Sequence, residues 1–154
     1  MSNLKIKDSM FTVNVDGACS GNPGDTGLGI VIENKVTGFK ENISQYAGLG
    51  TNNYAEYKAL IVALERVIEL GIRSVEVKSD SELLVKQLKG IYKVKKEHLK
   101  TLHDQVITLS SRLADFKIEH VRREFNAQAD LLAKNAIIEY RRTNRMVAAQ
   151  PKAV

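Results

Sequence analysis

The chain has 154 residues, of which 44% are hydrophobic and 27% are charged, and its formal net charge is +5. This balance predicts one globular core and excludes a wholly disordered chain, and no apolar run is long enough to span a membrane. Cys19 is the only cysteine, which excludes an intramolecular disulfide and the usual thiolate zinc site. Because the N-terminus also lacks a secretory signal, we expect a cytoplasmic protein, and the positive charge favours a polyanionic partner.

The first part of the chain predicts three strands. Residues 11–16 alternate apolar and polar side chains, so we expect a half-buried strand that ends at Asp16. Residues 17–29 contain five glycines and a proline, which indicates tight turns or a close approach of the backbone to another group. Residues 28–33 and 39–46 predict two further strands joined by a short turn, which completes an antiparallel meander.

The middle of the chain changes to a helical period. From residue 53 the apolar residues form one stripe of a helix, and Gly71 predicts its end. Residues 74–79 alternate again and predict a strand, which leads into a short helix over residues 81–89. A strand that feeds a helix favours a parallel crossover.

The last part of the chain predicts a helix, a strand and a helix. After a lysine-rich link, apolar residues from Leu99 to Leu113 predict a long helix. Residues 116–121 predict the fifth strand, and the last helix is expected from residue 127 to about residue 141.

This order predicts an α/β fold in which one mixed sheet, antiparallel then parallel, is flanked by helices. We find no internal repeat and no domain linker. The predicted domain covers residues 11–140, with a polar lead over residues 1–10. A basic tail without clear periodicity covers residues 141–154.

Four acidic residues stand at the predicted ends of these elements, and each has an ordinary structural alternative. Asp16 can support a turn, and Glu56 can complete a capping box that starts at Asn53. Asp80 can cap the helix that follows it. Asp130 can stabilise the last helix, because a negative charge in the first turn interacts favourably with the helix dipole. Glu56 nevertheless falls on the margin of the buried stripe, so its carboxylate can face the sheet.

Together the four acids favour a metal site, because strand ends and helix starts can converge on one edge of a sheet. Clustered carboxylates repel one another unless hard divalent cations such as Mg²⁺ or Mn²⁺ supply positive charge. Two such ions about 4 Å apart drive in-line displacement at a phosphodiester. The constellation therefore predicts nuclease chemistry.

The chain resembles the type 1 ribonucleases H from Phe11 to about Tyr140. The resemblance rests on four motifs in the same order and spacing. They are Val-Asp-Gly-Ala-Cys-Ser-Gly-Asn-Pro-Gly at 15–24, Thr-Asn-Asn-Tyr-Ala-Glu at 51–56, Ser-Asp-Ser at 79–81 and Asn-Ala-Gln-Ala-Asp at 126–130.

This resemblance implies a five-stranded sheet and two-metal-ion hydrolysis of the RNA strand of RNA/DNA hybrids, leaving 5′-phosphate and 3′-hydroxyl ends. The implied metal site contains Asp16, Glu56, Asp80 and Asp130 with two Mg²⁺ or Mn²⁺ ions. In our hypothesis, Asp16, Glu56 and Asp80 hold one ion, and Asp16 and Asp130 hold the other.

The resemblance also implies a surface that follows the minor groove of the hybrid, where the RNA 2′-hydroxyls are displayed. The implied contacts are Cys19, Gly21, Asn22, Asn52 and Asn53. Glycines let the backbone approach closely, and amide side chains both donate and accept hydrogen bonds. The alternative for the glycine segment is an ordinary turn.

One departure from the family concerns a histidine that many members carry in the loop before the last aspartate. Residues 122–129 contain none, and alternation predicts that His120 faces the core. Arg123 occupies the corresponding stretch and suits the scissile phosphate, with Glu124 as the less favoured candidate. We expect His98 and His103 at the surface of the long helix.

A second departure is that the large tryptophan-containing basic protrusion of some members is absent, since the chain has no Trp. A smaller basic group around Tyr92 is expected to hold phosphates of the DNA strand, and its alternative is a solvated helical face. This group consists of Lys86, Lys89, Lys93, Lys95, Lys96 and Lys100. The tail adds Arg141, Arg142, Arg145 and Lys152, which either pack on the domain or add nonspecific affinity.

Three alternatives to a hybrid nuclease remain at this point. The first is a catalytically silent module of the same fold that binds hybrid or double-stranded RNA. The second is an enzyme of this fold acting on a junction or a 3′ end. The third is a structural protein, for which we expect neither metal dependence nor salt-sensitive binding. In the favoured interpretation the protein is a monomer that binds an RNA/DNA hybrid and no membrane.

Overall fold

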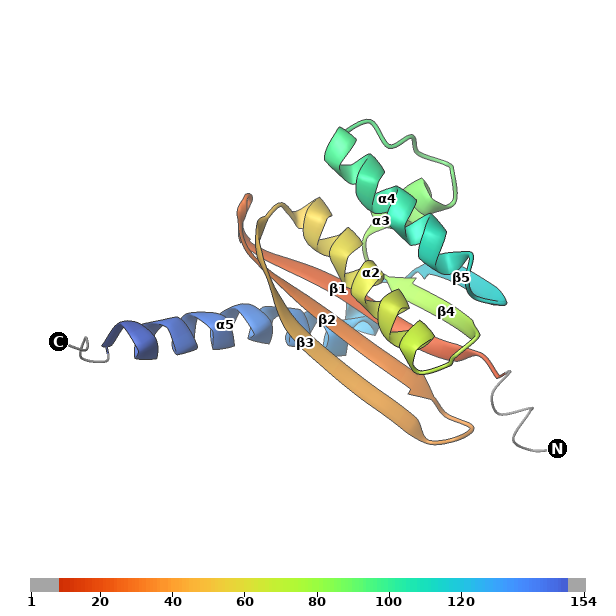
Figure 1. Cartoon of the computed structure of the whole chain (residues 1–154), viewed down its shortest axis with the longest axis horizontal. Coiled ribbons are helices and arrows are strands. Elements are labelled where there is room, and N and C mark those ends of the chain that lie inside the picture. The colour runs from red at the N-terminus through yellow and green to blue at the C-terminus, as the bar shows by residue number, and fades with distance from the viewer. Residues whose placement is uncertain (1–8, 150–154) are drawn as a thin grey trace.

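The chain folds into a five-stranded mixed sheet with helices against both faces (Figure 1). The computed structural model describes residues 9–149. The strands are β1 (Phe11–Gly21), β2 (Gly24–Asn34), β3 (Phe39–Gly50), β4 (Ser74–Ser79) and β5 (Asp115–His120). The helices are α2 (Asn52–Glu69), α3 (Glu82–Leu88), α4 (Glu97–Ser110) and α5 (Ala127–Ala149), with a 3-10 turn, η1 (Arg123–Phe125), before α5.

The strand order is β3-β2-β1-β4-β5, which confirms the predicted fold class. β2 pairs antiparallel with both β1 and β3, whereas β4 pairs parallel with both β1 and β5. The sheet places Val15 of β1 opposite Ser79 of β4, so that Asp16 and Asp80 follow at neighbouring positions. Sheet topology therefore brings two of the four acids together.

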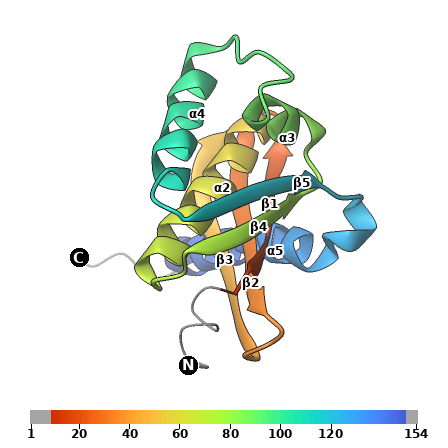
Figure 2. The same cartoon turned by 90° about the vertical axis from the view of Figure 1, so that its right-hand side faces the viewer.

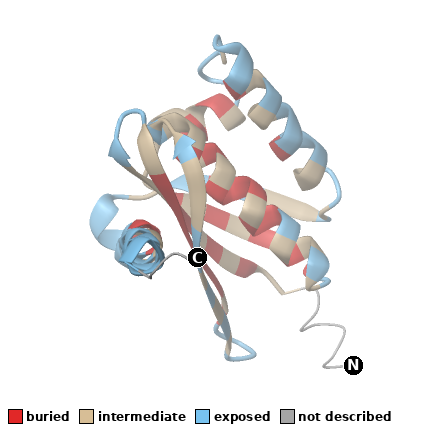
Figure 3. Ribbon diagram, turned by 60° about the vertical axis from the view of Figure 1, so that its left-hand side comes forward, coloured by how far each residue is buried: buried red, intermediate tan, exposed pale blue. Residues whose placement is uncertain are grey.

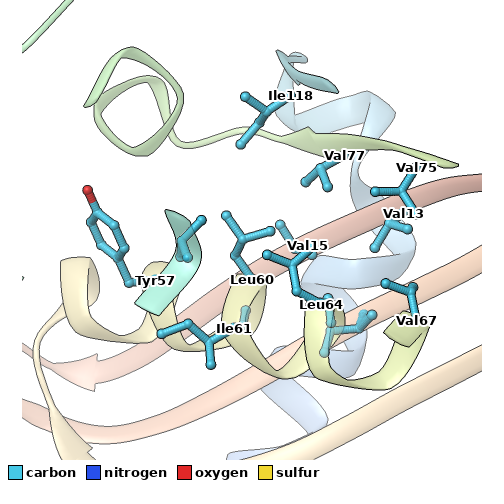
Figure 4. Packing of buried hydrophobic residues seen from close by; sticks show 14 of the residues in the cluster. Val13, Val15, Tyr57, Leu60, Ile61, Leu64, Val67, Val75, Val77 and Ile118 are labelled. Atoms are coloured by element: carbon cyan, nitrogen blue, oxygen red, sulfur yellow. The ribbon is translucent and has the colours of Figure 1, made fainter. Parts of the chain in front are cut away.

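The main core lies between the sheet and α2 (Figure 4). Val13, Val15, Val75 and Val77 point from the sheet toward apolar residues of α2, such as Leu60. The buried stripe of α2 faces the sheet, while the outer faces of α4 and α5 are exposed (Figure 3). α5 lies against the opposite face of the sheet, as the view from the β5 edge shows (Figure 2). None of the helices between residues 9 and 149 is both long and apolar enough to cross a membrane.

The glycine-rich segment is strand rather than turn, so the prediction that the first strand ends at Asp16 is wrong. β1 continues to Gly21, and only Asn22 and Pro23 connect it to β2. Glycines carry no side chain that could alternate, so the segment lacked the sequence signal of a strand although its backbone pairs throughout. β2 and β3 are likewise longer than predicted.

Three of these glycines allow helices to touch the sheet backbone. A Cβ on Gly29 would lie 1.9 Å from the carbonyl oxygen of Ala129, and one on Gly27 would lie 2.1 Å from that of Ala133. A Cβ on Gly17 would lie 2.3 Å from the carbonyl carbon of Ala55 in α2. The predicted close approach of this backbone to another group is therefore confirmed, and the group is the backbone of α2 and α5.

The last helix is longer than predicted. α5 continues past Arg141 to Ala149, so most of the predicted tail is helical. Its exposed final turns lack a buried stripe, which is why periodicity gave no signal there. Residues 1–8 of the predicted lead and residues 150–154, including Lys152, lie outside the described residues.

Candidate active site

Asp16 lies within β1 and is buried, with 4% of its surface exposed. It pairs across the sheet with Gly29 of β2 and is followed by Gly17, whose missing side chain admits the backbone of α2. The turn-supporting role weighed for Asp16 is therefore wrong, because no turn begins there. Its carboxylate instead occupies the junction between the sheet and two helices.

Glu56 comes to Asp16 from α2. The N-cap of α2 is Thr51, whose hydroxyl oxygen accepts a hydrogen bond from the amide of Tyr54 at 3.1 Å. The alternative role of Glu56 in a capping box that starts at Asn53 is therefore wrong, and Glu56 lies beyond the first turn. Its Oε2 atom is buried and has no hydrogen-bond partner among residues 9–149. This buried carboxylate oxygen is therefore available to bind a cation or a water molecule.

Asp80 directly follows Ser79, the last residue of β4, which pairs with Val15 of β1. The cap of α3 is Ser81, whose hydroxyl oxygen accepts from the amide of Leu84 at 3.2 Å. The alternative role of Asp80 as a helix cap is therefore also wrong, and its carboxylate remains free to face Asp16.

Asp130 lies in the first turn of α5, as expected, and forms an ion pair of 3.0 Å with Lys134. The start of α5 is tied to β1 by Asn126, which is 1% exposed. The Asn126 amide group donates to the carbonyl oxygen of Val15 at 2.9 Å and accepts from the Asn14 side chain at 2.9 Å. Asn126 thus fixes Asp130 beside Asp16, a positioning role that periodicity could not reveal.

The structure therefore brings the four predicted acids to one place. Asp16, Glu56 and Asp80 each offer a carboxylate oxygen, and these oxygens all lie within 4.8 Å of one another. Burial raises the pKa of Asp16 far above its usual value, and the charges of Glu56 and Asp80 and the contact with Asp130 raise it further. Burial also raises the pKa of Glu56, and the charge of Asp80 adds to that effect. Without added positive charge, the group cannot be fully ionised at neutral pH.

Asp130 differs electrostatically from Asp16 and Glu56. Partial burial opposes its ionisation, but the contacts with Lys134 and Asp16 outweigh this effect, so that the pKa of Asp130 is lowered. Asp130 is therefore ready to carry charge, whereas Asp16 and Glu56 resist ionisation.

This arrangement fits a divalent cation. The ligands are carboxylate oxygens from β1, α2 and the end of β4, and one buried oxygen is unpaired. Hard cations such as Mg²⁺ and Mn²⁺ prefer oxygen ligands, and their charge relieves the repulsion that raises these pKa values.

The acids line a cleft of about 560 Å³. Its lining also includes Cys19 and Asn52 among the predicted substrate contacts, and Arg123, Lys134 and Arg141 among the basic residues. The guanidinium Nε of Arg123 lies 4.0 Å from Oδ2 of Asp80. The four acids therefore form an acidic floor of the cleft. Its basic border consists of Arg123, Lys134 and Arg141.

The other predicted substrate contacts, which are Gly21, Asn22 and Asn53, do not line the cleft. The Asn22 side-chain oxygen accepts from the amide of Asn52 at 3.1 Å, which joins the β1–β2 hairpin to the start of α2. Gly21 has a φ of +90°, which favours glycine at the hairpin. The thiol of Cys19 contacts the carbonyl oxygens of Gly21 and Gly50. Asn53 is half-buried and does not line the cleft.

The prediction that His120 faces the core is wrong. His120 is exposed, although Ile118, two residues earlier on β5, is buried. β5 is an edge strand, and His120 is its last residue. On α4, His98 is exposed as expected, whereas His103 is half-buried.

The predicted basic group lies on α3, α4 and the link between them. Lys89, Lys93, Lys95 and Lys96 are exposed. Lys86 pairs with Glu82 at 2.5 Å and lies over the ring of Tyr92, 4.9 Å from its centroid. Lys100 pairs with Glu97 at 3.2 Å. None of these residues lines the cleft, so their role in phosphate binding stays a prediction.

Comparisons with known proteins support the same interpretation. The reverse transcriptase-like family matches residues 14–136. Ribonuclease HI of Halobacterium salinarum is 37% identical over 122 residues, which are 79% of this chain. The chain spans 61% of the length of that relative.

Solved structures agree closely with the fold. The crystal structure of RNase H1 from Halobacterium salinarum has a TM-score of 0.81 and 34% identity, covering 85% of this chain and 99% of that one. LC11-RNase H1, solved in complex with an RNA/DNA hybrid, has a TM-score of 0.80 and 38% identity, covering 84% of this chain and 98% of that one.

Proposed function

Because the chain belongs to the type 1 ribonuclease H family, we propose that it is an endonuclease that hydrolyses the RNA strand of RNA/DNA hybrids. The observation that carries the proposal is the convergence of Asp16, Glu56, Asp80 and Asp130 in one cleft. LC11-RNase H1, whose structure holds such a hybrid, supports the same substrate class.

The proposed cofactors are two Mg²⁺ or Mn²⁺ ions, one held by Asp16, Glu56 and Asp80 and the other by Asp16 and Asp130. When bound, such ions activate water and stabilise the attacking and leaving oxygens of a phosphodiester. Asp16 is the residue common to both proposed sites, in keeping with its central position among the other three acids.

The chain's own residues position the substrate. Arg123 is exposed at the border of the cleft and extends toward Asp80, where its guanidinium can hold the scissile phosphate. A guanidinium remains protonated, so Arg123 holds charge and does not shuttle protons. Arg123 therefore supplies phosphate binding at this position, but not the proton transfer that a histidine in this loop could also provide.

The rim of the cleft supports recognition of the hybrid. Cys19 and Asn52 line the cleft, and Asn22 is bonded to the backbone of Asn52, so hairpin and helix present one surface. We propose that this surface follows the minor groove, where 2′-hydroxyls distinguish RNA from DNA.

The direct experiment incubates the wild-type chain with a strand-labelled RNA/DNA hybrid, with Mg²⁺, with Mn²⁺ or with a chelator. Single-stranded RNA, duplex DNA and duplex RNA of the same sequence serve as controls. The expected result is metal-dependent cutting of the RNA strand of the hybrid, with 5′-phosphate and 3′-hydroxyl products. A chain that binds the hybrid but never cuts it is instead the catalytically silent module.

Two further features belong to the proposal. We propose a monomeric protein in the cytoplasm, supported by a single cysteine that does not require an oxidising compartment. Light scattering of the purified chain tests its oligomeric state, and cell fractionation tests its location.

A further inference from the structure

One face of α5 continues from the active-site cleft past the edge of the sheet. Lys134 and Arg141 both line the cleft, and Arg145 follows one turn later. At 100° per residue, these three cations fall within about 40° of one another around the helix axis. The final turns of α5 extend beyond β3 (Figure 1), and residues 141–149 are exposed (Figure 3).

The cleft adjoins a second hollow along this face. The second hollow measures about 500 Å³ and is lined by Asp25, Tyr46, Leu49, Tyr140, Arg141, Asn144 and Arg145. Arg141 borders both hollows. A substrate that leaves the cleft along α5 therefore meets a second concave surface that bears two arginines.

Contacts with the sheet hold Arg141 at this junction. Its guanidinium Nε and one terminal nitrogen each lie 2.9 Å from Oδ2 of Asp25. The Tyr46 hydroxyl donates to Oδ1 of Asp25 at 2.7 Å, and the rings of Tyr46 and Tyr140 stack with centroids 3.5 Å apart. These contacts fix this part of α5 against the sheet, and the guanidinium keeps further N–H groups for another ligand.

We propose that Arg141 and Arg145 form a second phosphate-binding subsite for the part of an RNA/DNA hybrid that extends beyond the cleft. This inference rests on the proposed function and adds a contact that the four acids do not require. At 1.5 Å per residue, Arg141 and Arg145 lie about 17 and 22 Å along the helix from Asp130. At about 3.4 Å per base pair, these distances correspond to roughly five to seven base pairs.

Arg142 provides a matched control. It stands next to Arg141 on the same exposed turn but lies about 100° further around the helix, and it pairs with Glu139 at 2.8 Å. It borders neither hollow. Replacing Arg142 removes the same charge from the same segment without touching the proposed subsite.

The test measures hybrid binding as a function of salt in an Asp80→Asn background, which keeps the substrate intact. Fluorescence anisotropy compares a hybrid of about 20 base pairs with a hairpin-closed hybrid of about 4 base pairs, which is too short to reach from Asp130 to Arg141. For the long hybrid, the Arg141→Gln/Arg145→Gln double variant is expected to lower the slope of log affinity against log salt by about two. Arg142→Gln is expected to leave that slope unchanged, and all variants are expected to bind the short hybrid alike.

The Arg141→Lys/Arg145→Lys variant keeps both charges and is expected to retain the wild-type slope, so a loss caused by misfolding is recognised. If the double glutamine variant behaves like Arg142→Gln, or weakens the short hybrid as much as the long one, the subsite does not exist. Cleavage by the chain with Asp80 intact is measured in parallel and separates the two claims. If this chain cuts no hybrid, the proposed function is contradicted. If it cuts normally and the double glutamine variant leaves the salt slope unchanged, only this inference is contradicted.

Discussion

The floor and the border of the cleft are built in opposite ways. The acids of the floor are held by packed backbone, with Gly17 against α2 and the buried Asn126 between β1 and α5. The cations of the border extend from exposed side chains, and Arg123 is 81% exposed. The floor therefore has a geometry fixed by the fold, whereas Arg123 on the border can adjust to a bound polyanion.

The largest effect is expected from removing charge in the floor. Asp80→Asn should lower kcat/KM for a hybrid by about 10³-fold or more, because a lost metal ligand removes several kcal/mol of transition-state stabilisation. Single-turnover cleavage in Mg²⁺ provides the measurement. Near-normal activity of this variant would place the chemistry elsewhere in the molecule.

A purely steric change in the floor should come next. A Cβ at position 17 would lie 2.5 Å from the amide nitrogen of Glu56, so Gly17→Ala must shift α2. We expect about 1–3 kcal/mol of lost stability from overpacking and about a 10²-fold loss of activity from displacement of Glu56. The control is Gly38→Asn, since nothing lies within 4 Å of a Cβ there and Asn tolerates its positive φ. Equal effects of the two variants would mean that close packing does not position the acid.

The repulsion within the floor predicts a dependence of stability on pH in metal-free protein. Asp16 ionises near its usual pKa of 3.8 when the chain is unfolded, but burial and its acidic neighbours raise that pKa in the folded state. Between the two values the unfolded state binds fewer protons, so folding stability falls as pH rises above about 4. Asp16→Asn should therefore gain on the order of 2 kcal/mol at pH 7 and little at pH 4. Urea unfolding at both pH values measures this difference, and an Asp16→Asn variant that is less stable at pH 7 would refute it.

The smallest effect is expected at the border. Arg123→Gln should lower kcat/KM by about tenfold, the value of one charged hydrogen bond to phosphate. Arg122→Gln is the matched control, because Arg122 is similarly exposed and does not line the cleft. If the two variants lose activity to the same extent, Arg123 contributes only general charge.

The sequence predicted the five strands in order and all four acids, because alternation, helical period and the family motifs report directly on those features. It did not predict the extent of β1 or α5. Glycines that pair in a strand and exposed residues that end a helix leave no apolar pattern.

Within the candidate site, the sequence could not show how the acids are held. Thr51 and Ser81 cap their helices and leave Glu56 and Asp80 free, which depends on where each helix begins. Asn126 acts on β1 from a distant part of the chain, and His120 is exposed at the end of the edge strand β5. Such features depend on tertiary packing, which local sequence patterns do not report.

Calorimetric titration of Mn²⁺ into the wild-type chain and Asp16→Asn at pH 7 tests most directly whether the packed floor is a cation site. We expect saturable Mn²⁺ binding by the wild type, accompanied by proton release because ligands with raised pKa values must ionise. Asp16→Asn should bind at least about tenfold more weakly, since it loses the carboxylate at the centre of the group. Equal binding by the two proteins, or no binding by the wild type, would contradict the account.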